Sequence, residues 1–185
     1  SSFHPSAEVP WIVWGDSASN DALVWNYQTQ EVILRLRGHE ESVVYSAFSP
    51  SGKQIVTASL DGTAKIWNVT VTAEMCELLA TIPWDHVSAN PAEAESFFPA
   101  FDSSGRRVFS RAPAKDAWPN DAPHLAYSCK TGIRDDSIGG ANGLAGFHPN
   151  ESCYLSVDFL SIEIRSLQTN VGLVTFLIPG TSLTG

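Results

Sequence analysis

The chain has 185 residues, of which 43% are hydrophobic and 17% charged, and its formal net charge at pH 7 is −9. This composition suits a globular domain with its own apolar core, and no apolar run reaches the length of a membrane-spanning helix. The negative charge argues against a nucleic acid partner, because proteins usually contact the phosphate backbone through clustered Lys and Arg. Cys76, Cys129 and Cys153 are irregularly spaced. They indicate neither a disulfide framework nor a zinc site and favour thiols in a reducing, intracellular compartment.

An internal repeat organises the sequence. Residues 2–5, 47–50 and 146–149 each contain Phe followed by a polar residue and then Pro. Residues 99–102 are a weaker copy of this motif. Each copy lies where an apolar strand should end and a hairpin turn should begin. The chain therefore divides into four units of similar length.

Each unit is expected to contain four antiparallel strands. The first strand of the first unit is incomplete, and the pattern at residues 133–138 is the weakest. In chain order, the strands are predicted at residues 1–5, 11–14, 22–26, 31–37, 42–48, 53–59, 64–69, 77–82, 96–101, 107–110, 124–129, 133–138, 143–147, 153–158, 162–167 and 171–178.

The second unit carries the most specific pattern. Gly38-His39, Ser59, Asp61-Gly62 and Ile66-Trp67 resemble the signature of the WD40 repeat in residue type and spacing. The other units are degenerate copies, with Tyr127 and Arg165 where the Trp would stand. The resemblance implies an all-β fold, a single β-propeller segment over residues 1–185. Its blades of four antiparallel strands are expected at residues 1–38, 39–82, 83–140 and 141–180.

Closure is an open question for such a segment, because propellers usually need four to eight blades to remove their open edges. Four degenerate blades with an incomplete first one would make an unusually small ring. We therefore expect a part of a larger propeller, or a ring that another copy of the chain completes.

Ser59, His39 and Asp61 are the residue types of a hydrolase triad. The resemblance implies instead a structural hydrogen-bond network in which His39 bridges Ser59 and Asp61, and the indole N–H of Trp67 donates to Ser59. A nucleophile would need an exposed Ser with nearby oxyanion donors, whereas Ser59 lies at an ordinary strand end. No catalytic residue is expected. No cofactor or metal site is expected either, since His86 has no second His or Cys at ligand spacing.

Two long connections in the third unit, residues 83–96 and 112–123, should emerge side by side on one face of the propeller, and long loops are often functional. Trp118 is a candidate hot spot for a partner, although it could equally pack back on its own loop. The candidate partner-binding residues are Trp118, Asp116, Asp121, Glu93, Glu95 and Asp85. Further carboxylates are expected on this face from Asp16, Glu40, Glu41, Asp135 and Asp136.

The expected function is a non-catalytic protein–protein interaction scaffold that binds a protein or peptide partner with a basic segment. The alternative is a carbohydrate-binding propeller, because exposed Trp and Asn or Asp side chains also suit sugars. That alternative predicts repeated pockets, and Trp118 has no equivalent in the other units. Neither a nucleic acid nor a membrane is expected as partner, and the open edges are expected to be met either by self-association or by further blades in a parent chain.

Overall fold

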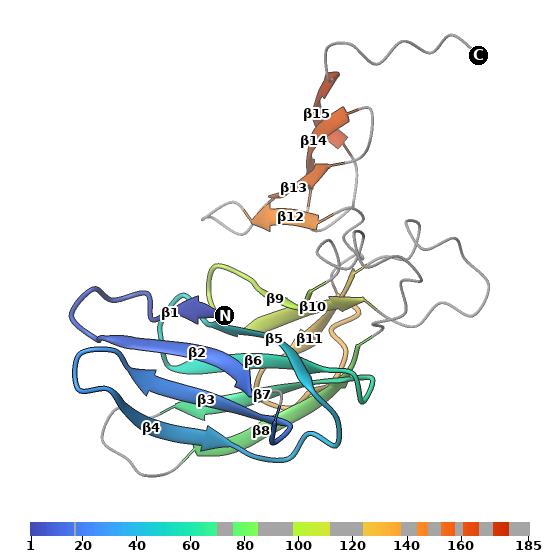
Figure 1. The fold of residues 1–185 in the computed structure, drawn as a ribbon. Coiled ribbons are helices and arrows are strands. Elements are labelled where there is room, and N and C mark those ends of the chain that lie inside the picture. The colour runs from blue at the N-terminus through green and yellow to red at the C-terminus, as the bar shows by residue number, and fades with distance from the viewer. Residues whose placement is uncertain are drawn as a thin grey trace, which may run out of the picture.

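The computed structural model describes residues 1–16, 18–69, 76–84, 98–111, 124–137, 144–147, 153–157, 161–166 and 172–177. These residues form strands and turns without a helix, and the strands make four antiparallel sheets (Figure 1). Within the same ranges, nothing has the length and apolar character of a membrane-crossing helix.

Every sheet is a meander, in which strands adjacent in sequence pair with one another. The first sheet contains β1 (Ser2–Phe3), β2 (Trp11–Asp16), β3 (Asp21–Asn26) and β4 (Glu31–Leu36). The second contains β5 (Val43–Phe48), β6 (Gln54–Ser59), β7 (Thr63–Val69) and β8 (Cys76–Pro83). The third contains β9 (Ala100–Phe101), β10 (Arg107–Arg111) and β11 (His124–Ser128). The fourth contains β12 (Leu144–Phe147), β13 (Cys153–Val157), β14 (Ser161–Ser166) and β15 (Gly172–Leu177). These blade-like sheets confirm the predicted all-β fold class.

The second sheet shows why the sequence folds in this way. Buried residues run almost continuously along β6, so both of its faces are packed, and tight turns separate the strands. Gly52 and Gly62 have φ angles of 71° and 80°, in the left-handed region that glycine tolerates best. The amide of Gly62 donates to the carbonyl of Ser59 at 3.2 Å and closes the β6–β7 turn.

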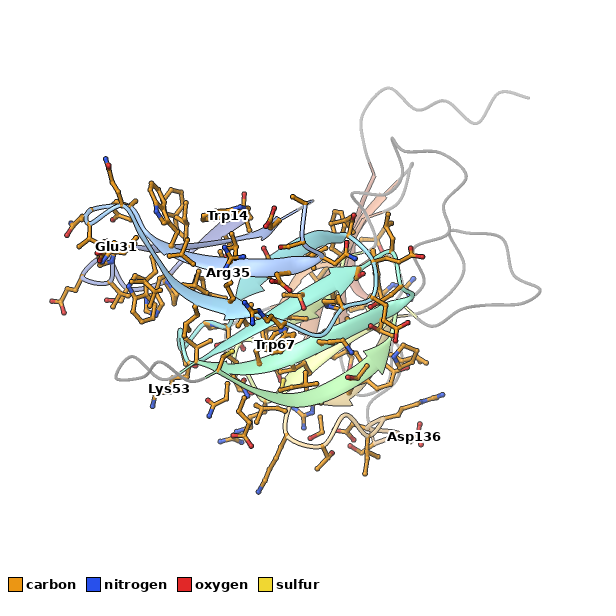
Figure 2. All side chains as sticks on the ribbon, turned by 60° about the horizontal axis from the view of Figure 1, so that its bottom comes forward. Trp14, Glu31, Arg35, Lys53, Trp67 and Asp136 are labelled. Carbon is orange, nitrogen blue, oxygen red and sulfur yellow. The ribbon has the colours of Figure 1, made fainter. Side chains whose placement is uncertain are left out.

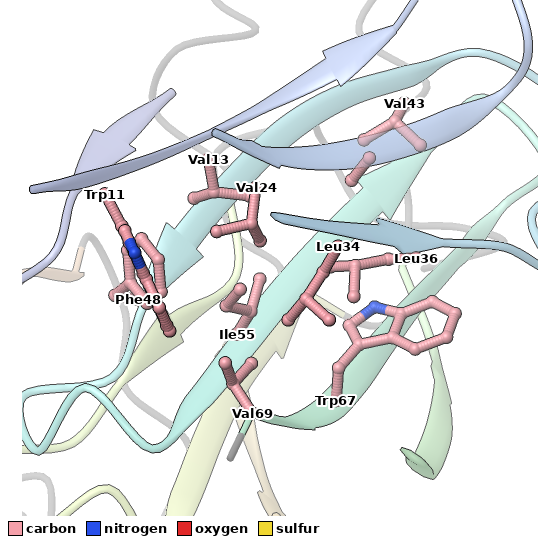
Figure 3. Packing of buried hydrophobic residues seen from close by; sticks show 11 residues of the cluster. Trp11, Val13, Val24, Leu34, Leu36, Val43, Phe48, Ile55, Trp67 and Val69 are labelled. Atoms are coloured by element: carbon pink, nitrogen blue, oxygen red, sulfur yellow. The ribbon is translucent and has the colours of Figure 1, made fainter. Parts of the chain in front are cut away.

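The second sheet lies between the first and the third. Alternate residues of each of its strands point to opposite faces, so each face packs against a different neighbouring sheet. Ile55 and Trp67 are paired across β6 and β7 and pack against the first sheet, in a cluster that also contains Val24 and Leu34 (Figure 3). On the opposite face, Val56, Ala58, Ala64, Ile66 and Ile82 pack with Val108 and Tyr127 of the third sheet. Two apolar interfaces therefore hold the three sheets together.

The first and second sheets come closest where β2 meets β5. A Cβ atom at Gly15 would lie 2.1 Å from the carbonyl oxygen of Val43, which is a backbone atom with little freedom to move. Only glycine allows this approach without displacing a strand.

The third sheet differs from the prediction in its outer strand. The strand expected at residues 133–138 is reduced, over the described residues 133–137, to one bridge between Tyr127 and Arg134. Around this bridge, the amide of Ser128 donates to the carbonyl of Ile133 at 2.9 Å, and the amide of Asp135 donates to the carbonyl of Ala126 at 2.8 Å. The carboxylate of Asp135 accepts the Nε–H of Arg107 at 2.8 Å. The same carboxylate also accepts the amide of Ser137 at 3.1 Å, which turns the chain away.

The fourth sheet lies apart from the other three in Figure 1. Among the described residues, the members of both buried clusters come from the first three sheets. Face-to-face packing of neighbouring sheets is therefore seen for the first three sheets.

Candidate functional site

The connection between β4 and β5 meets the β6–β7 turn at one end of the second sheet. His39, which is 8% exposed, comes from the connection, and Asp61 comes from the turn. The Nδ1 atom of His39 lies 2.8 Å from the Oδ2 atom of Asp61. Asp61 also accepts the amide of Glu40 at 3.1 Å and the amide of Thr63 at 2.9 Å. One carboxylate thus fixes both the imidazole and the backbone of two loops.

The other ring nitrogen of His39 reaches into the sheet. Its Nε2 atom lies 2.7 Å from the Oγ1 atom of Thr57, and the indole Nε1–H of Trp67 donates to the same oxygen at 2.9 Å. Because the indole can only donate, the Thr57 hydroxyl is free to donate its own proton to an unprotonated Nε2. The Nδ1–H of a neutral His39 then donates to Asp61. One order of donors and acceptors, which we call the proton order, thus satisfies every hydrogen bond from Trp67 through Thr57 and His39 to Asp61.

The hydroxyl between His39 and Trp67 was predicted to be that of Ser59, and this prediction is wrong. The hydroxyl of Ser59 donates to the carbonyl of Glu41 at 2.7 Å and accepts the amide of Asp61 at 3.1 Å. Residues 57 and 59 share one face of β6, but Trp67 pairs with Ile55, so its indole reaches only the nearer of the two. A hydroxyl within an otherwise apolar strand was the signal that could have identified Thr57.

Burial and hydrogen bonding shift the pKa values of the two titrating groups. Burial lowers the pKa of His39, although the hydrogen bond with Asp61 and its negative charge oppose this shift. Burial alone would raise the pKa of Asp61, but hydrogen bonds from Thr63, His39 and two backbone amides outweigh it and lower the pKa to about 2. His39 is therefore neutral and Asp61 ionised at neutral pH, as the proton order requires.

This geometry does not form a nucleophile and base. Ser59 is 0% exposed, and its hydroxyl binds the Glu41 carbonyl rather than His39. In the part of the chain that the structure describes, no cluster of His, Cys, Asp or Glu has the composition of a metal site. The four residues Trp67, Thr57, His39 and Asp61 instead tie two loops to the two central strands.

The same end of the stack carries a group of surface loops. Asn20, in the β2–β3 turn, donates its side-chain amide to the carbonyl of Glu40 at 3.0 Å, which joins the first sheet to the second. The amide of Trp84 donates to Gly62 at 3.0 Å, and the hydroxyl of Ser110 donates to the carbonyl of Pro83 at 2.9 Å. The described ends of the two long connections of the third unit therefore lie next to the β6–β7 turn. We call this end of the stack, with the turns at 16–21, 37–42 and 60–62, the upper face.

The predicted partner-binding residues within these connections lie outside the described residues: Asp85, Glu93, Glu95, Asp116, Trp118 and Asp121. Of the other carboxylates predicted for this face, Asp16 and Glu40 lie in turns that Asn20 joins. Asp135 is instead bound to Arg107 on the third sheet, and Asp136 pairs with Arg134. The ion pair between Arg107 and Asp135 was not predicted from the sequence.

Residues 30–68 match the sequence model described as WD domain, G-beta repeat. The match includes β4 of the first sheet and continues through β5 and β6 into β7 of the second. It contains His39, Thr57, Asp61 and Trp67. Residues 30–68 are therefore a WD40 repeat, and the meander sheets have the form of the blades that such repeats build.

Several proteins are similar to this chain over segments of 52 to 60 residues. Periodic tryptophan protein 2 homolog of Mus musculus is 43% identical over 58 residues, which are 31% of this chain and 6% of the relative. Periodic tryptophan protein 2 of Saccharomyces cerevisiae is 40% identical over 60 residues, 32% of this chain and 6% of the relative. Protein FIZZY-RELATED 2 of Arabidopsis thaliana is 44% identical over 52 residues, 28% of this chain and 11% of the relative. The matches thus span only a small part of these relatives, and WD40-repeat proteins in general act as protein-interaction scaffolds.

Proposed function

We propose that the protein is a non-catalytic scaffold that binds a basic segment of a partner protein on its upper face. The observation that supports this proposal is the charge of the described loops there. Glu40 and Glu41 are both exposed, and within the described ranges neither contacts a basic side chain. Arg35 and Arg37, which lie nearby on the first sheet, both contact Asp21 at 3.8 and 3.7 Å.

The position of these carboxylates suits recognition of a partner. The Glu40 backbone is held by Asn20 and by Asp61, so the charged side chain extends from a fixed support. Such fixed, complementary charges steer a basic partner and set its orientation more than they add affinity. The long connections at 83–96 and 112–123 would add contact area on the same face, with Trp118 as an anchor.

Binding to Arg- and Lys-rich peptides tests the proposal, with fluorescence anisotropy at low and high salt as the measurement. Glu40→Gln with Glu41→Gln should weaken binding about threefold to tenfold, because each lost charge contributes up to about 1 kcal/mol at an exposed site. Trp118→Ala with Asp116→Asn should weaken it further, and raised salt should reduce the affinity of the unaltered chain.

A matched control removes the same charge elsewhere. Glu8 and Glu31 are exposed at the opposite end of the first sheet, where Figure 2 shows Glu31. Glu8→Gln with Glu31→Gln should leave affinity unchanged. If the two double variants weakened the affinity equally, the affinity would depend on the net charge alone, and this result would refute a binding site on the upper face. Specific binding on a glycan array, without peptide binding, would favour the carbohydrate alternative.

We also propose an intracellular location. Cys76 and Cys129 are free thiols, and burial raises the pKa of Cys129 to about 12, which keeps it protonated and unreactive. Such thiols suit a reducing compartment.

A further inference from the structure

The turns at the end of the stack opposite the upper face carry three exposed basic residues. Lys53 lies in the β5–β6 turn, Arg106 in the β9–β10 turn, and Lys130 in the turn that follows β11. Within the described ranges, none of the three side chains contacts a carboxylate. Figure 2 shows the side chain of Lys53 extending away from the sheets. We call these three residues the lower basic cluster.

The three turns are neighbours in space. Gly105, which precedes Arg106, faces the β5–β6 turn, because a Cβ atom at Gly105 would lie 3.6 Å from the Cβ atom of Ser49. The amide of Cys129, which precedes Lys130, donates to the carbonyl of Arg106 at 2.9 Å. The lower basic cluster therefore extends over adjacent turns from the second sheet to the third.

Hydrogen bonds fix the backbone that carries each cation. The last amide of β7 donates to the carbonyl of Lys53 at 2.8 Å. The amide of Arg106 donates to the carboxylate of Asp102 at 3.0 Å, and the amide of Lys130 donates to the hydroxyl of Ser128 at 3.3 Å. Cations on a fixed backbone lose less conformational entropy when they bind a partner than cations on a mobile loop.

The carboxylate within these turns points inward. Asp102 is 1% exposed, and its oxygens accept the hydroxyl of Ser104 at 3.0 Å and the Nη1–H of Arg107 at 3.4 Å. Glu77 is exposed at the same end of the second sheet, but it lies on β8, two strands away from β6, which follows Lys53. The lower basic cluster therefore keeps a local positive charge although the chain as a whole is acidic.

We infer that the lower basic cluster binds a short acidic segment of a partner protein, one rich in Asp and Glu. Ammonium and guanidinium groups bind carboxylates through charge-assisted hydrogen bonds, and guanidinium groups also through two parallel bonds at once. Three cations on adjacent turns suit a few carboxylates along one short segment. A nucleic acid fits less well, because its binding relies on many phosphate contacts and the net charge of −9 repels a long polyanion.

This site does not depend on the proposed function of the upper face. Lys53 immediately precedes β6, and β6 ends at Ser59, whose hydroxyl binds the carbonyl of Glu41 on the upper face. The two groups of charges thus lie at opposite ends of the same strand. They suit partners of opposite charge, and one chain can bind both partners at once.

Fluorescence anisotropy with a labelled peptide of alternating Glu and Ser tests the inference. Lys53→Gln with Lys130→Gln should weaken binding about threefold to tenfold, because an exposed ion pair contributes modestly to affinity. Adding Arg106→Gln should weaken binding further, and raised salt should lower the affinity of the unaltered chain. The three side chains are exposed, so circular dichroism and the midpoint of thermal unfolding should be unchanged.

A matched control removes two positive charges elsewhere. Arg37 follows β4 at the upper face, and Lys65 lies within β7. Arg37→Gln with Lys65→Gln should leave the affinity for the acidic peptide unchanged. The Lys53 and Lys130 changes should in turn leave the affinity of the upper face for an Arg- and Lys-rich peptide unchanged.

Three results would overturn the inference. The unaltered chain would show no salt-dependent binding of the acidic peptide if the three cations were only solvated. Equal weakening by the control variant would show that the affinity depends on the net charge alone. A single-stranded oligonucleotide that bound as tightly as the peptide, and lost affinity in the same variants, would indicate a nucleic acid site instead. Failure of the basic peptide to bind would refute only the proposed function of the upper face.

Discussion

Replacement of Thr57 by Val gives the most direct test of the hydrogen-bond chain. Valine has nearly the shape of threonine, so packing along β6 should be kept while the hydroxyl is lost. The Nε1 atom of Trp67 and the Nε2 atom of His39 would lose their partner, and these residues are 2% and 8% exposed. Each unsatisfied buried group costs about 1–3 kcal/mol. We therefore expect the free energy of unfolding to fall by about 2–6 kcal/mol.

Urea denaturation measures this loss as a lower midpoint with an unchanged slope. Ser59→Ala is the matched control, because Ser59 lies two residues further along the same face and has the hydroxyl first expected to bind Trp67. It loses the hydrogen bonds to the Glu41 carbonyl and from the Asp61 amide, at the edge of the sheet, and should cost about 1–2 kcal/mol. Thr57→Val should therefore be the more damaging of the two.

An independent measurement follows the protonation of His39. The Thr57 hydroxyl donates to the unprotonated nitrogen and so favours the neutral imidazole. Removing the hydroxyl should raise the pKa of His39, which nuclear magnetic resonance can follow directly. A larger stability loss for Ser59→Ala than for Thr57→Val, or an unchanged pKa of His39 in Thr57→Val, would refute the proposed proton order.

Three further predictions address packing and pH. Gly15→Ala should lower the free energy of unfolding by about 3 kcal/mol, measured by thermal unfolding, because the new Cβ would strike the Val43 carbonyl; an unchanged midpoint would contradict this close approach. The buried hydroxyl of Ser46 has no hydrogen-bond partner among the described residues, so Ser46→Ala should leave stability unchanged or raise it by up to about 1 kcal/mol. Below about pH 6.5 the unfolded chain protonates His39 while the folded chain does not, so stability should fall as the pH falls. A second loss should begin below the ordinary pKa of Asp61, 3.8, and continue towards about 2, and flat stability across both ranges would argue against these shifts.

Local pattern sufficed to predict most strands. In the second sheet, strands were predicted at 42–48, 53–59, 64–69 and 77–82, and the structure has them at Val43–Phe48, Gln54–Ser59, Thr63–Val69 and Cys76–Pro83. Alternating apolar residues and glycine turns act over a few neighbouring residues, so the sequence alone reveals them. The fourth sheet, which lacks the repeat signature, was predicted for the same reason.

Contacts between distant residues were less predictable. Thr57 and Ser59 have the same chemistry and the same face, and only the pairing of Trp67 with Ile55 decides which hydroxyl the indole reaches. The outer strand predicted at residues 133–138 was too long, since the described residues pair with β11 only over residues 133–135. Arg107 engages Asp135 across 28 positions of sequence, and no local pattern reveals such a contact.

The WD40 repeat at residues 30–68 is offset from the sheets that it builds. It supplies β4 as the last strand of one sheet and β5, β6 and most of β7 to the next. A tandem duplication of this segment would thus extend the molecule by a complete sheet and leave every sheet with its outer strand. An engineered insertion before β4 should be tolerated better than one between β6 and β7. An insertion before β4 does not interrupt the repeat, whereas an insertion between β6 and β7 divides it.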